Sequence, residues 1–199
     1  MQLLLIRHAL PVHSPGSSDP VLDELGLRQA QRVPDAVARY GVRRVYSSPQ
    51  VRARQTAEPT ASKLGVEVDV VDDLAEYDRE LPFYMPAEEA KQHETWARLT
   101  LGELPDQIDG PAFKGRVVEA VGEIAGAADH DDTVAAFAHG GVINVYLQDI
   151  LGNEKSLGFQ IDYCSVTRVL FSRSGRRAVA AVNETEHVWD LLPRVIARR

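Results

Sequence analysis

The sequence predicts an α/β fold, a three-layer sandwich built around a largely parallel central sheet. Short apolar runs alternate with longer segments of helical periodicity, so that the first about seventy residues read as strand, helix, strand, helix, strand. A histidine stands at the end of two of the apolar runs: His8 follows the first run after Arg7, and His139 directly follows a later one. Strands alternating with helices favour parallel pairing, and functional side chains in such folds gather at the carboxyl ends of the strands.

Turn and cap residues place the elements of the first half. The continuous apolar run before Arg7 is typical of a strand buried on both faces. Gly41 separates a helical pattern from a β-branched run, and Ser48 and Pro49 suit the N-cap and first position of a second helix, which ends before Gly65. We expect strands at residues 3–6, 42–46 and 66–71, and helices at residues 23–40 and 48–64.

The middle of the chain interrupts this alternation. Residues 72–111 are richer in proline, glutamate and aromatic side chains, with a helical pattern over residues 88–101. We interpret the segment as an excursion that forms a lid or wall over a site. No linker or repeat is present, so residues 1–199 are expected to form a single domain. The later elements are expected to be helices at residues 112–128 and 142–151, and strands at 133–138, 166–171 and 178–182.

Composition excludes several classes of protein. The contents of 44% hydrophobic and 26% charged residues are typical of a globular chain. The net charge of −7 repels polyanions and so disfavours general binding of nucleic acid or anionic lipid. The single cysteine, Cys164, excludes an internal disulfide and is expected to be a buried small hydrophobe. With no signal peptide and no apolar stretch of about 18 residues, we expect a cytoplasmic protein.

Arg7 and His8 form the first candidate site. Neighbouring side chains on a regular strand point to opposite faces, so both can reach one site only if the chain leaves strand geometry there. The alternative is that the two residues are only the polar end of a strand. Judged from this dipeptide alone, the two interpretations are equally favoured.

Arg52 is the second candidate. A cation in the first turn of a helix opposes the helix macrodipole by roughly 0.3 to 1 kcal/mol, and a bound anion at that end would reverse the sign. The alternative is a solvated arginine on an exposed helix face, which fits Arg54 better.

His139, followed by Gly140 and Gly141, is the third candidate. Two glycines at the start of a helix let backbone N–H groups approach a ligand and direct a helix N-terminus at an anion. A lone histidine is more often structural, and a lone pair of glycines is weak evidence. The three candidates together indicate an anion site at one edge of the sheet.

Five short motifs follow one another along the chain, and a final pair of polar residues closes the series. In chain order they are Arg7-His8-Ala9, residues 19–30, Ser47 to Ala57 around Arg52, Leu74-Ala75-Glu76, residues 137–143 around His139, and the closing Asn183 and His187. In this order they resemble the motifs of the histidine phosphatase superfamily, the phosphoglycerate mutase-like family. The resemblance covers nearly the whole chain and implies that family's fold, with Asn183 and His187 more structural than catalytic.

Three positions depart from the family pattern. Members commonly have glycine and glutamate where this chain has Ala9 and Leu10. Many place a phosphate-binding asparagine where this chain has Ser14, whose hydroxyl can still donate a hydrogen bond. These departures leave the catalytic set intact, leave the substrate open and weaken the resemblance to a glycolytic mutase.

The resemblance implies a mechanism in which His8 is the nucleophile and becomes a phosphohistidine. Arg7, Arg52 and His139, with Gly140 and Ser14, would bind the phosphoryl group, and nearby cations keep His8 neutral. Glu76 would protonate the leaving oxygen and then activate water. We expect no metal and no cofactor. The acidic residues expected to raise the pKa of Glu76 are Asp72, Asp73, Asp78 and Glu80.

The leading functional hypothesis is a phosphatase that hydrolyses small phosphomonoesters. One rival is a phosphoglycerate mutase, which the short chain without a long C-terminal tail disfavours. The other is a non-catalytic phosphate-binding module, which the full set of competent catalytic residues disfavours. The expected partner is a small phosphorylated metabolite, with no nucleic acid and no membrane, and a homodimer is left open.

Overall fold

The structure is a computed structural model that describes residues 1–12, 18–80, 84 and 97–198. Within these residues six strands form one sheet in the order β3-β2-β4-β1-β5-β6. β1 to β4 pair in parallel, whereas β5 is antiparallel to both β1 and β6. The strands are β1 Gln2–Arg7, β2 Val42–Ser47, β3 Val68–Val70, β4 Thr133–Ala138, β5 Val166–Phe171 and β6 Arg177–Glu184.

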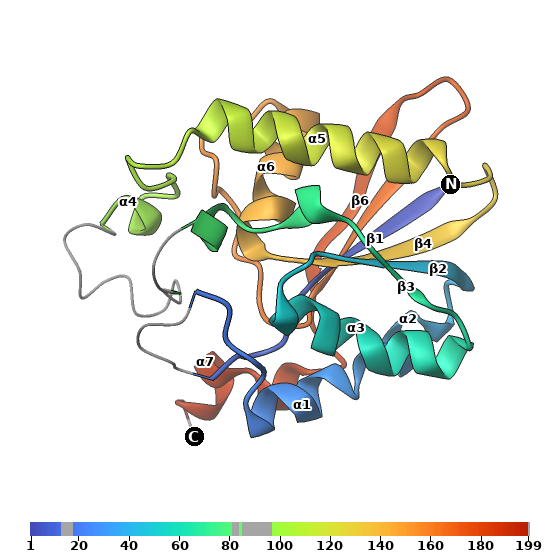
Figure 1. Ribbon diagram of the computed structural model, residues 1–199, viewed down its shortest axis with the longest axis horizontal. Coiled ribbons are helices and arrows are strands. Elements are labelled where there is room, and N and C mark those ends of the chain that lie inside the picture. The colour runs from blue at the N-terminus through green and yellow to red at the C-terminus, as the bar shows by residue number, and fades with distance from the viewer. Residues whose placement is uncertain (13–17, 81–83, 85–96, 199) are drawn as a thin grey trace.

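Helices cover both faces of this sheet, which confirms the predicted three layers (Figure 1). α5 and α6 pack on one face, and α1, α2, α3 and α7 pack on the other. The α-helices are α1 Glu24–Ala30, α2 Val33–Ala38, α3 Val51–Leu64, α4 Ala97–Thr100, α5 Gly110–Gly126, α6 Gly140–Leu151 and α7 Pro193–Ile196. Among the described residues no helix is both long and apolar enough to cross a membrane.

The central strand β1 shows why its sequence is continuously apolar. Leu3 and Leu5 pack into the core beneath α5 and α6, while Leu4 and Ile6 pack into the core beneath α1, α2 and α3. All four side chains have no exposed surface. Successive side chains of a strand point to opposite faces, so a strand covered on both sides needs an apolar residue at every position.

The register of β1 and β4 sets the position of the two histidines. Arg7 lies opposite Ala138, the last residue of β4, and the His8 N–H donates to the Ala138 carbonyl over 2.9 Å. The two strands therefore end at the same level. His8 and His139, which follow them, are brought to one edge of the sheet although 131 positions of numbering separate them (139 minus 8).

The helix predicted over residues 23–40 is wrong in one respect, because the chain forms two helices there. α1 ends at Ala30 and α2 begins at Val33, with Pro34 in its first turn. Proline has no N–H to donate to a carbonyl one turn earlier, and its ring clashes with that carbonyl. The helix therefore breaks just before the proline.

The start predicted for the next helix is also corrected. α3 begins at Val51, with Gln50 rather than Ser48 as its N-cap, and the Gln50 side chain does not cap it. The cap comes from another segment: both carboxylate oxygens of Asp19 accept from the Val51 N–H over 3.0 Å. Ser48 is thereby left available for a different contact.

The excursion contributes short helical turns in its described part. Two 3-10 helices, η1 Asp72–Leu74 and η2 Tyr77–Glu80, follow β3, and α4 precedes α5. The helix predicted over residues 88–101 falls mostly outside the described residues, and α4 is the part of it that the structure describes. β3 is shorter than the predicted strand at residues 66–71.

Gly26 gives a test of the packing between α1 and the chain that follows β1. A Cβ at Gly26 would lie 2.0 Å from the carbonyl oxygen of Leu10. We expect Gly26→Ala to lower the free energy of unfolding by about 1 to 3 kcal/mol, because the backbone must shift. Gly122→Ala is the control, since its Cβ would meet no neighbour within 4 Å. It should raise the free energy of unfolding by about 0.5 to 1 kcal/mol. Urea denaturation measures both, and equal effects would contradict the packing.

Candidate active site

A pocket of about 320 Å³ lies at the carboxyl ends of β1 and β4. Of the predicted site residues it brings together Arg7, His8, Arg52, Glu76 and Gly140, which all line it. His139 is fully buried and does not line the pocket, but its ring centroid lies 5.1 Å from that of His8. Ser14 lies outside the described residues.

His8 is held with one ring nitrogen available for chemistry. Its Nδ1 atom lies 2.7 Å from the carbonyl oxygen of Ala9. A carbonyl oxygen only accepts, so Nδ1 carries the hydrogen and Nε2 keeps its lone pair. Burial lowers the pKa of His8 well below its ordinary value, and the charges of Arg52 and Arg7 lower it further. His8 is therefore a neutral imidazole at neutral pH.

Arg7 is positioned by a segment that carried no recognisable motif. Its Nη1 donates to the carbonyl of Ile161 over 2.6 Å, and its guanidinium carbon lies 3.9 Å from the centroid of the Tyr163 ring. Cys164 is fully buried, as expected, and its N–H donates to the Arg7 carbonyl over 3.1 Å. Because two of these contacts are made through the main chain, no residue type in the segment could have revealed them.

Arg52 has no exposed surface and is paired with carboxylates. Its Nη2 donates to both oxygens of Asp78 over 3.0 and 3.2 Å, and its Nη1 lies 3.5 Å from Asp19. Asp19 also accepts from Val51 at the start of α3. The expected anion at this helix end is therefore present as protein carboxylates, which offset the unfavourable position of the arginine.

Glu76 is held at the start of α6. Its Oε2 accepts from the Gly141 N–H over 2.8 Å, and its Oε1 accepts from the Tyr77 N–H over 3.1 Å. A Cβ at Gly141 would lie 2.2 Å from Oε1, so only glycine fits. The second glycine of the Gly140-Gly141 pair therefore serves the protein's own carboxylate.

The environment of Glu76 favours its protonated form. Burial is the main cause and the Asp78 charge the second, and together they raise the pKa of Glu76 to about 7 against the opposing N–H groups and Arg52. Of the acidic residues expected to act in this way, Asp78 does so. Asp72 and Asp73 are exposed in η1, and the side chain of Glu80 lies outside the described part of the structure.

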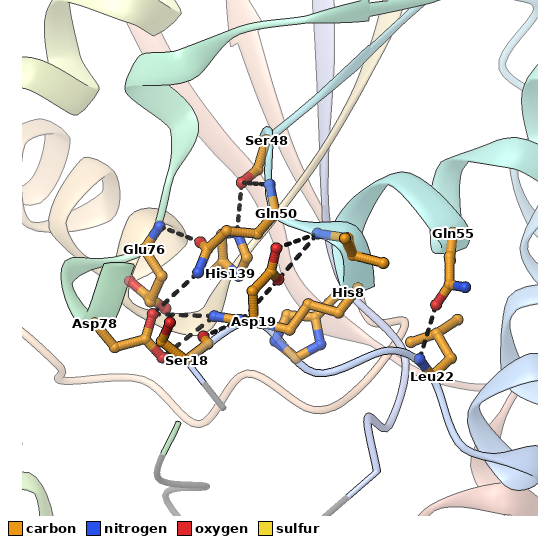
Figure 2. A network of polar contacts seen from close by, with 12 residues as sticks. His8, Ser18, Asp19, Leu22, Ser48, Gln50, Gln55, Glu76, Asp78 and His139 are labelled. Carbon is orange, nitrogen blue, oxygen red and sulfur yellow. Dashed lines mark hydrogen bonds and ion pairs between the residues drawn. The ribbon is translucent and has the colours of Figure 1, made fainter. Parts of the chain in front are cut away.

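Gln50 connects the two charged parts of the site, a role that the sequence did not suggest. Its Nε2 donates to Asp78 over 3.2 Å, and its Oε1 accepts from the Glu76 N–H over 2.7 Å. Figure 2 shows Gln50 between Glu76, Asp78 and Ser48. The available signal was its place two residues before Arg52, in the loop where β2 leads into α3.

His139 is oriented by Ser48. Its Nε2 lies 2.7 Å from the Ser48 hydroxyl, which also accepts from the Gln50 N–H (Figure 2). Burial lowers the pKa of His139 well below its ordinary value, and the Arg52 charge lowers it further. In the described structure the buried Nδ1 of His139 and Nε of Arg52 have no hydrogen-bond partner. Buried polar atoms of this kind are costly unless a ligand or water satisfies them.

Asn183 and His187 lie behind the site and do not line the pocket. Asn183, at a positive φ of 59°, donates to Asp162 over 3.0 Å, and His187 Nε2 lies 3.0 Å from the Cys164 carbonyl. Both support the segment that positions Arg7. Within the described residues no cluster of three or more histidine, cysteine, aspartate or glutamate side chains could hold a metal ion.

Solved structures of similar fold include several phosphatases. The phosphoserine phosphatase of Entamoeba histolytica in complex with 3-phosphoglyceric acid is 22% identical, with a TM-score of 0.75 over 94% of this chain and 98% of the other. A mycobacterial glucosyl-3-phosphoglycerate phosphatase with bound VO3 is 22% identical, with a TM-score of 0.76 over 92% and 98%. YhfR of Bacillus stearothermophilus is 21% identical, with a TM-score of 0.79 over 94% and 98%.

Curated relatives match nearly the whole chain. A bifunctional protein of Mycobacterium tuberculosis is 31% identical over 94% of this chain, which spans 55% of that relative's length. A probable phosphoglycerate mutase of Proteus mirabilis is 27% identical over 96% of both chains. The model of the histidine phosphatase superfamily, branch 1, matches residues 3–185. With these residues matched and the site in place, the chain belongs to the histidine phosphatase superfamily.

Proposed function

We propose that this protein hydrolyses small phosphomonoesters and that His8 carries the phosphoryl group as an intermediate. The observation that carries the proposal is the state of His8: a neutral ring, with Nδ1 bonded to a carbonyl and Nε2 unprotonated, between two arginines. A nucleophile needs a free lone pair, and the developing charge on phosphorus oxygens needs cations nearby. This edge of the sheet supplies both.

The phosphoryl oxygens are bound by donors around His8. Arg7 and Arg52 supply positive charge, and the Nε–H of Arg52, which has no partner in the described structure, donates to an oxygen of the bound phosphoryl group. The Ser48 hydroxyl accepts from the Gln50 N–H, and in the tautomer that we propose it donates to Nε2 of His139, so that the ring hydrogen lies on Nδ1. His139 therefore acts as a neutral hydrogen-bond donor to the phosphoryl group.

The reaction has two displacements. Nε2 of His8 attacks phosphorus and the ester P–O bond breaks, while the departing oxygen takes a proton from Glu76. Water then attacks the phosphohistidine and gives a proton to the Glu76 carboxylate. The N–P bond breaks, inorganic phosphate leaves, and His8 is again neutral. A carboxyl group whose pKa is about 7 suits both the acid and the base role near neutral pH.

The names of the similar proteins support this assignment. Two solved structures of the same fold are phosphatases, one of phosphoserine and one of glucosyl-3-phosphoglycerate. The probable phosphoglycerate mutase that matches over 96% of its length makes transfer of the phosphoryl group back to the substrate the second candidate. A cytoplasmic location and a single domain stay predictions.

His8 provides the direct test of the function. We expect wild-type protein mixed with a ³²P-labelled alkyl phosphate and quenched with alkali to carry label on histidine and to release phosphate. His8→Ala should reduce both to background because it removes the proposed phosphoryl acceptor. His130→Ala is the control and should behave as wild type, since His130 is exposed on the loop before β4. A parallel assay uses labelled 3-phosphoglycerate as the substrate. Its conversion to an isomer with the label at a second position, without phosphate release, would establish the mutase instead.

Gly141 tests the proton donor. We expect Gly141→Ala to displace the Glu76 carboxylate and lower kcat for an alkyl phosphate by about 10²-fold or more, the usual worth of general acid catalysis. The first turnover of p-nitrophenyl phosphate, whose leaving group needs little protonation, should be much less affected. Gly122→Ala should change neither rate. Equal losses for both substrates, measured by rapid quench, would mean that Glu76 positions the substrate and does not donate.

Asp78 tests the origin of the Glu76 pKa. Since Glu76 must be protonated to act as acid, kcat for an alkyl phosphate should fall as pH rises through about 7. Asp78→Asn removes the charge that raises this pKa, so the falling limb of the pH profile should move to lower pH. Asp73→Asn, at an exposed position of η1, should leave the limb in place. An unmoved limb in Asp78→Asn would assign the whole shift to burial.

A further inference from the structure

The pocket lining includes a group of apolar side chains that takes no part in the proposed phosphate binding. Four apolar side chains line it: Leu99 of α4 and Leu157, Phe159 and Ile161 of the segment after α6. The residue between Leu157 and Phe159 is Gly158, which carries no charge. The pocket thus combines arginines and a histidine with four apolar side chains, which form its apolar wall.

This wall is fixed to the helix that begins at the active site. The side-chain amide of Asn144 in α6 accepts from the Phe159 N–H over 2.8 Å and donates to the Phe159 carbonyl over 3.0 Å. It also donates to the Gly140 carbonyl over 2.9 Å. Asn144 lines the pocket, but its polar atoms are already engaged within the protein. Its role is to hold Phe159 in place.

The turn that carries Leu99 is attached to the same segment. The Leu157 N–H donates to the Gly102 carbonyl over 2.9 Å, and Lys155 forms an ion pair with Glu103. A Cβ at Gly102 would lie 3.0 Å from the Leu157 carbonyl oxygen, so the two backbones are in close contact. Leu99 and Leu157 therefore belong to one preformed surface.

Among the described lining residues, the polar ones outside the phosphate end are uncharged or acidic, and none is a cation. Asp162 is bound by Arg194 through two hydrogen bonds of 2.9 and 2.7 Å and accepts from Gln160 over 3.0 Å. Among the described lining residues the arginines are Arg7 and Arg52, and both serve the phosphoryl group. A carboxylate on the leaving group would lose water against an apolar wall without an opposite charge, which is costly.

From this arrangement, and resting on the proposed function, we infer that the substrate is a phosphomonoester of an uncharged, apolar alcohol. Its alkyl or aryl group lies along Leu99, Leu157 and Phe159 while its phosphate lies at His8. Burial of apolar surface supplies the binding free energy for this part of the substrate. The preference separates this chain from proteins of the same fold whose names specify phosphoserine and glucosyl-3-phosphoglycerate.

A matched pair of substrates tests the inference. Hexyl phosphate and 6-(phosphonooxy)hexanoate have similar leaving alcohols and differ in a terminal carboxylate. We expect kcat/KM to be higher for hexyl phosphate by about ten-fold or more, the scale at which apolar pockets discriminate. Equal values, or a preference for the carboxylate, would overturn the inference.

Variants of the wall locate the effect. Phe159→Ala should lower kcat/KM for hexyl phosphate by about ten-fold and leave inhibition by vanadate, a probe of the phosphate end, unchanged. Phe159→Arg should narrow or reverse the preference because it supplies the missing cation. Leu157→Ala repeats the test where a Phe159 variant fails to fold, as judged by thermal unfolding. Leu170→Ala, at an exposed position of β5, is the control and should match wild type. An unchanged ratio of the two substrates in folded wall variants would contradict the inference.

The outcomes separate the two proposals. Hydrolysis of both substrates with labelled His8 but no preference for the apolar one overturns the substrate inference and leaves the phosphatase standing. No hydrolysis of either substrate and no labelled histidine in wild type overturns the proposed function, and the substrate inference with it.

Discussion

The burial of Arg52 is the constraint on which the rest of the site depends. A guanidinium with no exposed surface cannot keep its hydration, and an unpaired buried charge costs several kcal/mol, about 3 to 5 when a partner is removed. Two carboxylates from different segments, Asp19 and Asp78, meet this demand. The loop before α1 and the turn after β3 are therefore both tied to the start of α3. The arginine organises the site before any ligand arrives.

The same pairing also sets the acidity of the site. Asp78 neutralises Arg52 and at the same time faces Glu76, whose proton it helps to retain. In the proposed mechanism a phosphoryl group and Asp78 share the charge of one guanidinium, that of Arg52. Asp78 therefore links the charge of Arg52 to the protonation of Glu76, and the two hydrogen bonds of Gln50 hold Asp78 and Glu76 in position.

Much of the fold and the site was predictable from short-range signals. The apolar run before Arg7 and the matching run before His139 predicted parallel strands that end together, and the register of β1 and β4 agrees. The resemblance to the family supplied Glu76, which composition alone would have left as an exposed acid. Pro34, which splits one predicted helix, was visible in the sequence but was outweighed by helical periodicity.

What could not be predicted depends on contacts between distant segments. The Ile161 carbonyl that holds Arg7 is a main-chain group, which any residue would provide. The cap of α3 comes from Asp19, thirty-two positions before Val51. It does not come from Ser48, which is the residue that local capping rules favour. Helix-capping rules consider residues that are close in sequence. Here a residue from a distant segment, Asp19, caps the helix, and the Ser48 hydroxyl forms a hydrogen bond with His139 instead.

The proposed catalytic groups and the pocket wall lie on different parts of the chain. The side chains to which we assign the chemistry lie at the ends of β1 and β4, in α3 and in the turn after β3. The apolar wall belongs to α4 and the segment after α6, and it is secured largely through main-chain hydrogen bonds and the amide of Asn144. Side chains at positions 99, 157 and 159 can thus be exchanged without disturbing those bonds. In the evolution of such proteins, single substitutions at these positions can therefore change which alcohol is recognised. The residues proposed to carry out the chemical step stay the same.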